Sequence, residues 1–174
     1  MECYILKQDD HVSNYPRIKD TKQIRNVFGD VTPMYCETKE YSSSLGYIEL
    51  PFIDKPCFIV SDEIKKIFSS YQEGGQFRTV MFSGKDGYSV LYHFYQPVLI
   101  DCLSDVTVFY SKKTVKELVL DGSKIGANKV FQVAGLSEKY LIVDLEILEI
   151  MLCNGIYPIV FQKVAISRET NNGS

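Results

Sequence analysis

The sequence has no tryptophan, only two histidines, and no apolar run near the roughly 20 residues of a membrane-spanning helix. Its opening stretch, MECYILKQDD, lacks the basic segment and the long apolar stretch of a signal peptide. The net charge of −3 and the pI of about 5.4 also lack the basic excess that nucleic-acid binders show. We therefore expect a cytoplasmic protein whose partner is neither a membrane nor a nucleic acid.

Metal-binding and disulfide patterns are missing as well. The five cysteines are scattered along the chain, at Cys3, Cys36, Cys57, Cys102 and Cys153. No two of them have CxxC spacing, and the two histidines, His11 and His93, stand far apart, whereas a structural zinc site needs four clustered ligands. An odd number of thiols inside apolar runs predicts buried free cysteines in a reducing compartment. We expect neither a metal nor a cofactor.

What the chain does contain is a large share of strand-forming and aromatic residues. It has 12 tyrosines and 10 phenylalanines, and 45% of its 174 residues are hydrophobic, as in a globular protein with a real core. We predict an α+β fold in a single domain, residues 1–167, with a mainly antiparallel sheet on which two short strand-to-helix units pack. The polar stretch 168–174 is predicted to be a disordered tail.

Apolar alternation and turn residues place most of the strands. Lys85-Asp86-Gly87 separates two alternating segments within 77–97, which is a strong β-hairpin signal. Asp121-Gly122 separates two further short strands within 116–135. The other expected strands are 3–7, 47–52, 57–61, 98–105, 106–110, 139–143 and 157–166.

One motif occurs twice. FIVSDEIKKIF at 58–68 and LIVDLEILEIM at 141–151 both describe a strand that runs into a helix with a Ser or Asp N-cap. The two helices are expected at 62–72 and 144–153, and the second is apolar on most of its circumference, so we expect it to be the more buried. The match is consistent with a duplication or with one common scaffold solution used twice.

A phosphate-binding turn does not fit either copy of this motif. Such turns need glycines where the backbone approaches the phosphates, and neither junction has one. Both place acidic residues at the positive end of the helix, Asp62 and Glu63 in one case and Asp144 and Glu146 in the other. These carboxylates complement the helix dipole and would repel an anion.

The best candidates for nucleophilic catalysis are His93 as a base and Cys102 as a thiol, with Asp101 beside it. No cationic neighbour in the sequence lowers the pKa of Cys102, and no paired carboxylates are recognisable. A hydrogen-bonded sheet histidine and an inert buried thiol are the simpler interpretation. We expect no catalytic site.

Three stretches together resemble a known family. They are YILKQDD at the start, YHFYQPVLIDCLSD in the middle and VFQVAGLSEKYLIVDLEILEIMLCNGI near the end. They are similar to an immunity-protein family of bacterial polymorphic toxin systems, typified by myxobacterial immunity-type domains. The resemblance implies a small cytoplasmic protein that binds and neutralises a cognate toxin and that has no catalytic residues of its own.

The functional hypothesis is therefore a protein-binding protein. Tyrosine is favoured at interfaces, and the tyrosine-rich loop segments offer Tyr15, Tyr35, Tyr41 and Tyr47 as candidate contact residues. Two alternatives remain open at this point. One is an enzyme with a site around His93, and the other is a structural or regulatory domain of a mobile element. The sequence does not determine the oligomeric state.

Overall fold

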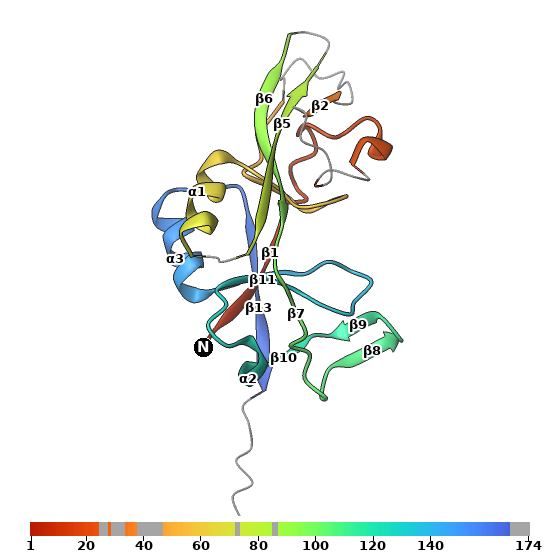
Figure 1. The fold of residues 1–174 in the computed structure, drawn as a ribbon, viewed down its shortest axis with the longest axis vertical. Coiled ribbons are helices and arrows are strands. Elements are labelled where there is room, and N and C mark those ends of the chain that lie inside the picture. The colour runs from red at the N-terminus through yellow and green to blue at the C-terminus, as the bar shows by residue number, and fades with distance from the viewer. Residues whose placement is uncertain (25–27, 29–33, 38–46, 72–73, 85–86, 168–174) are drawn as a thin grey trace, which may run out of the picture.

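A computed structural model describes residues 1–24, 28, 34–37, 47–71, 74–84 and 87–167. The chain forms two main sheets with the helices α1 (Asp62–Tyr71) and α3 (Leu145–Cys153) side by side (Figure 1). The α+β class expected from the sequence is confirmed. The tail at 168–174 and the hairpin residues Lys85 and Asp86 lie outside the described residues.

One sheet belongs to what we call the N-terminal unit, which also contains α1. Its five strands lie in the order β2 (Met34–Glu37), β5 (Gln76–Ser83), β6 (Ser89–Gln96), β4 (Ile59–Val60) and β3 (Phe52–Ile53). Strands β5 and β6 pair antiparallel over their full length, which confirms the predicted hairpin. The expected strand at 47–52 is shorter than predicted and begins only at Phe52, after Pro51.

The other sheet belongs to the C-terminal unit, which contains α3. Its six strands lie in the order β10 (Val119–Asp121), β13 (Val160–Ser167), β1 (Cys3–Lys7), β12 (Leu141–Asp144), β11 (Val130–Val133) and β7 (Leu99–Ile100). The first strand of the chain thus lies in the middle of the C-terminal sheet (Figure 1). Smaller elements are the 3-10 helix η1 (Thr21–Ile24), the short helix α2 (Gly122–Ile125) and the hairpin β8 (Val108–Ser111) with β9 (Thr114–Glu117).

Two local features refine the expected pattern of strands. The sheets are mixed, because β2 with β5, β10 with β13 and β7 with β11 pair parallel, each at a sheet edge. The two short strands expected around Asp121-Gly122 are β10 and β11, and the short helix α2 lies between them. The Asp121 carboxylate accepts a hydrogen bond from the Ser123 amide at 3.0 Å and caps α2.

The two units repeat one strand arrangement. In the N-terminal unit β2 is parallel to β5, and β5, β6, β4 and β3 follow with antiparallel pairing. In the C-terminal unit β10 is parallel to β13, and β13, β1, β12 and β11 follow with antiparallel pairing. The order along the chain also agrees, with one exception. The place that β6 holds in one unit is held in the other by β1, from the opposite end of the described chain.

The repetition extends to single residues. Phe52 pairs with Val60 in one sheet, and Val130 pairs with Val143 in the other. In each unit the strand then enters its helix through an N-cap, because Ser61 Oγ accepts from the Ile64 amide and Asp144 Oδ1 accepts from the Ile147 amide. Val60 and Val143 are 83 residues apart in the sequence. The same spacing separates buried Ile64 from buried Ile147, and buried Phe68 from buried Met151. The motif seen twice in the sequence is therefore part of a repeat that spans the full five-strand arrangement.

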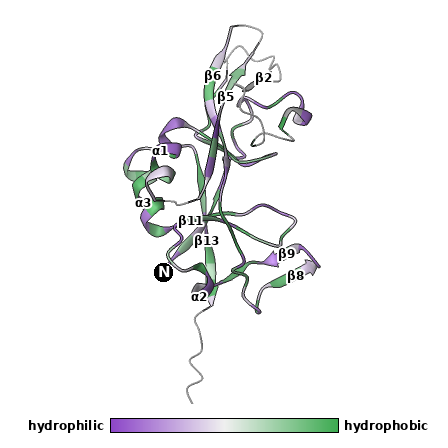
Figure 2. Ribbon diagram, viewed as in Figure 1, coloured by the Kyte–Doolittle hydropathy of each residue, from purple (hydrophilic) through white to green (hydrophobic). Residues whose placement is uncertain are grey.

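A central hydrophobic cluster lies between the units. It takes equivalent side chains from both, which are Phe52, Val60, Ile64 and Phe68 from one and Val130, Val143, Ile147 and Met151 from the other. The expectation that α3 is more buried than α1 is wrong. In Figure 2 α3 is greener, and so more hydrophobic, than the mostly purple α1, yet each helix buries two residues and Leu152 of α3 is 56% exposed.

Candidate functional site

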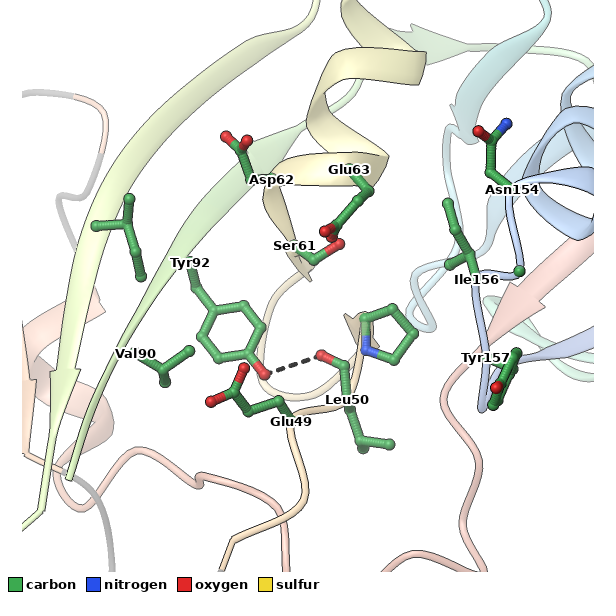
Figure 3. A pocket seen from close by; sticks show the side chains of 13 residues that line it. Glu49, Leu50, Ser61, Asp62, Glu63, Val90, Tyr92, Asn154, Ile156 and Tyr157 are labelled. Carbon is green, nitrogen blue, oxygen red and sulfur yellow. Dashed lines mark hydrogen bonds between the residues drawn. The ribbon is translucent and has the colours of Figure 1, made fainter.

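The candidate site is an open cleft of about 380 Å³ where the two units meet (Figure 3). One wall comes from the N-terminal unit, including the segment before β3, the start of α1 and strand β6. The other wall is the segment that follows α3. The lining residues are Glu49, Leu50, Pro51, Ser61, Asp62, Glu63, Val90, Leu91, Tyr92, Asn154, Gly155, Ile156 and Tyr157.

Three carboxylates give this cleft its negative charge. Asp62 is paired, because its Oδ2 lies 2.6 Å from Lys66 Nζ, one helical turn further on. This hydrogen bond lowers the pKa of Asp62. Glu49 and Glu63 are exposed, and no described residue forms an ion pair or a hydrogen bond with either carboxylate. The cleft therefore presents two uncompensated negative charges.

The floor and the rim of the cleft are apolar or aromatic. Tyr92 is buried below it and donates its hydroxyl hydrogen to the Leu50 carbonyl at 2.9 Å (Figure 3). At the rim, Leu91 is 46% exposed and Tyr157 is 78% exposed. Exposed aromatic side chains are enriched at protein–protein contact sites, so Tyr157 beside this cleft is a candidate contact residue.

His93 lies behind the cleft wall. Its Nδ1 is 3.1 Å from Thr79 Oγ1, and its Nε2 is 3.3 Å from Asp62 Oδ1 but not aligned for a hydrogen bond. The ring is 2% exposed, and this burial is the main cause that lowers the pKa of His93. A carboxylate of the cleft thus stands next to the histidine, but the imidazole itself is covered.

This burial predicts a pH effect on stability. Unfolded histidine binds a proton near pH 6.5, whereas the lowered pKa keeps folded His93 neutral further into acid. Its stability contribution is therefore present above about pH 6.5 and is lost as the pH falls below that value. Urea unfolding, measured once above and once well below about pH 6.5, should show that wild type loses more stability in acid than His93→Gln does. Equal losses would show that His93 does not titrate in this way.

The four candidate interface tyrosines have different outcomes. Tyr15 is 6% exposed and its hydroxyl accepts a hydrogen bond from Gln8 Nε2 at 3.1 Å, so this side chain packs in the core rather than on the surface. Tyr47 is half-buried, with its ring 4.4 Å from that of Tyr88. Tyr35, in β2, pairs through its backbone with Met81 in β5, and Tyr41 lies outside the described residues. Neither Tyr15 nor Tyr47 lines the cleft.

The structure does not bring His93 and Cys102 together. Cys102 is fully buried in a separate cluster with Cys3 and Leu120, while Asp101 is exposed beside it. Burial raises the pKa of Cys102 to about 11, so its thiol carries almost no thiolate near neutral pH. The same cause raises the pKa of Cys3 and Cys36 to about 11 and that of Cys57 to about 12.

A second exposed surface is the hairpin β8–β9, which projects from the molecule (Figure 1). All four residues of β8 are exposed, including Phe109 and Tyr110, and Lys112 and Lys113 lie at its turn. A two-stranded sheet alone is marginally stable in water. This hairpin is therefore a further surface that a partner could cover.

The cleft could not be predicted from the sequence, because its walls come from four segments that are distant along the chain. Glu63 was interpreted only as a helix-dipole residue, and Glu49 and Tyr157 carry no motif.

Within the described part of the chain, no three His, Cys, Asp or Glu side chains form a group that could hold a metal ion. No helix among the described residues is long and apolar enough to cross a membrane. Neither a scan against protein-family models nor a search of curated proteins finds a match for this chain.

Proposed function

We propose that this protein binds a basic protein partner through the acidic cleft, and that it acts as an immunity protein that neutralises a cognate bacterial toxin without chemistry of its own. The observation that carries the proposal is the cleft itself, which has the unpaired carboxylates of Glu49 and Glu63 in one wall and the exposed ring of Tyr157 in the other. The resemblance to toxin-immunity proteins supplies the biological role. We place the protein in the cytoplasm, with neither nucleic acid nor membrane as its partner.

The charge of the cleft supports a basic protein rather than an anionic ligand. Phosphate groups would meet Glu49, Asp62 and Glu63 and be repelled. A toxin that acts on nucleic acid would present the opposite charge, because surfaces that bind phosphate backbones are rich in lysine and arginine. Complementary charges also speed association, which suits a protein that must capture a harmful partner early.

Binding is favoured over catalysis at this site. The enzyme alternative requires His93 to reach a substrate, and the imidazole is covered by the cleft wall. The buried thiols have raised pKa values and are unsuited as nucleophiles. A structural or regulatory domain of a mobile element would use the same cleft for a different partner, so the test must include the toxin itself.

The test is protection of cells. The toxin encoded next to this gene is expressed with wild-type protein and with the double variant Glu49→Gln/Glu63→Gln. Wild type should restore growth and form a complex, whereas the double variant should lose most protection while keeping its fold, since neither carboxylate has a described partner in the free protein. The matched control is Asp105→Asn/Glu149→Gln, which removes two exposed acidic groups that belong neither to the cleft nor to the β8–β9 hairpin. Failure of wild type both to protect and to form a complex would refute the proposal.

A further inference from the structure

The internal repeat relates the acidic cleft to a second position in the molecule. Because Phe52 is equivalent to Val130, Pro51 is equivalent to Lys129. The backbone confirms this match, since the Ser61 amide donates to the Pro51 carbonyl at 2.9 Å and the Asp144 amide donates to the Lys129 carbonyl, also at 2.9 Å. Along the two strand-to-helix junctions equivalent residues are 83 positions apart, so Glu63 in the cleft is equivalent to Glu146.

At the second position the chain provides its own cation. Lys129 Nζ lies 2.5 Å from Glu146 Oε2 and 5.0 Å from the centre of the Tyr71 ring. Tyr71 comes from the end of α1, in the other unit, and it is equivalent to Asn154, which lines the cleft. A lysine ammonium thus sits between a first-turn glutamate of one unit and a tyrosine in the last helical turn of the other, as charge pairing and cation–π attraction favour.

The cleft keeps the equivalent first-turn glutamate, Glu63, but has Asn154 in place of Tyr71, and no cation is among the described residues that line it. Proline replaces the lysine, so no amine extends from position 51 towards Glu63. Glu49 adds a second carboxylate, and Tyr157 supplies an exposed aromatic ring from the segment after α3. The nearby Lys66 is held by Asp62, and behind that carboxylate the buried Nε2 of His93 has no hydrogen-bond partner among the described residues.

We propose that the cleft is a receptor for a lysine ammonium group, and that in function this group belongs to a lysine side chain of the protein partner. The inference rests on the proposed function for the source of the lysine, but the chemistry of the site follows from the repeat. The incoming ammonium takes the position that Lys129 Nζ takes in the C-terminal unit. It contacts Glu63 and Glu49, with Tyr157 over its stem.

The experiment uses the isotope-labelled full-length chain and Nα-acetyl-lysine methylamide as the probe, followed by NMR. Wild type should show saturable shifts confined to the cleft, at Glu49, Glu63 and the segment 154–157. Pro51→Lys supplies an internal cation and should weaken probe binding about tenfold or more, the loss of one charge-assisted contact. Glu63→Gln should weaken binding similarly, and it keeps the test informative if the Pro51 variant does not fold.

The repeat also predicts a gain of binding. Lys129→Ala vacates the equivalent position, and this variant should show a second set of saturable shifts around Glu146 and Tyr71. In Lys129→Ala/Glu146→Gln that second set should disappear while the cleft shifts remain. Free n-butylamine, which carries the lysine stem and a single ammonium, separates in a parallel titration a general amine receptor from one that needs the lysine backbone as well.

Absence of cleft shifts in wild type, or equal binding in wild type and both cleft variants, would overturn the inference. Stronger binding of n-butylamine than of the lysine probe would assign the site to a free amine and overturn the partner-lysine source. A failure of the proposed toxin-neutralising function can be distinguished from a failure of the ammonium site, because the titration contains no toxin. Probe binding without cell protection would refute the toxin role alone, and protection without probe binding would refute the ammonium site alone.

Discussion

Deletion of residues 1–7 is expected to unfold the C-terminal unit and leave the protein unable to reach its native state. Strand β1 hydrogen-bonds to β12 on one side and to β13 on the other, so its loss splits the six-stranded sheet in the middle. It also removes the buried side chains of Cys3, Ile5 and Leu6 from two hydrophobic clusters. Circular dichroism and amide exchange should show lost strand structure and unprotected amides in β12 and β13.

The same strand should restore the fold when it is attached at the other end. In the N-terminal unit the residues 84–88 connect β5 to β6, with Ser83 opposite Ser89. β13 and β1 are the equivalent antiparallel pair, with Val164 opposite Cys3. In a permuted chain, a loop as long as the segment 84–88 joins residue 167 to residue 2, so that β1 follows β13. This chain should therefore regain native amide protection. If the deletion variant folds, or if the permuted chain remains unfolded, the equivalence of β1 and β6 is not sufficient for folding.

Substitution of Phe68 by alanine is expected to lower the free energy of unfolding by about 3–5 kcal/mol, the usual cost of removing a buried aromatic ring. Phe68 is fully buried in the central cluster, and its ring centre lies 5.3 Å from that of Tyr95. The cavity would open where the two units share their core, so one cooperative transition should shift as a whole. Urea unfolding followed by circular dichroism and by tyrosine fluorescence measures this loss.

Two matched variants make this result interpretable. Met151→Ala removes the equivalent side chain of α3 and should cost about 2–5 kcal/mol. Leu152→Ala, the next residue, removes a side chain that is 56% exposed and should change stability by only about 0.5 kcal/mol or less. A loss below about 1 kcal/mol for Phe68→Ala would mean that the central cluster is not the shared core of the two units.

The local elements could be predicted from the sequence because their signals are local. The N-caps Ser61 and Asp144, the helical spacing after them and the turn around Gly87 each depend on a few neighbouring residues. The pairing of β1 could not be predicted in this way. Cys3 and its partner Val164 are distant in sequence, and no local pattern specifies which strand a buried apolar segment joins.

The candidate site was less predictable than the fold. Sequence reasoning selected tyrosines by type, but Tyr15 is a core residue, because a tyrosine with a hydroxyl partner can be buried at little cost. The cleft depends instead on Glu49, Glu63 and Tyr157, which come from different segments and which only the packing of the two units brings together. The repeat is visible in the sequence as a short motif that occurs twice. The function that we propose depends on a difference between the two copies, which have Pro51 in one and Lys129 in the other.

The central place of β1 also has a consequence for biosynthesis. All strands of the N-terminal sheet lie between Met34 and Gln96, so that sheet can close while the ribosome is still translating the rest. β1 leaves the ribosome before any other strand of the chain described here, but its two neighbours are made last. Until β13 emerges, this apolar strand has open edges and must be kept from pairing elsewhere, which makes it the segment of the nascent chain most in need of a chaperone.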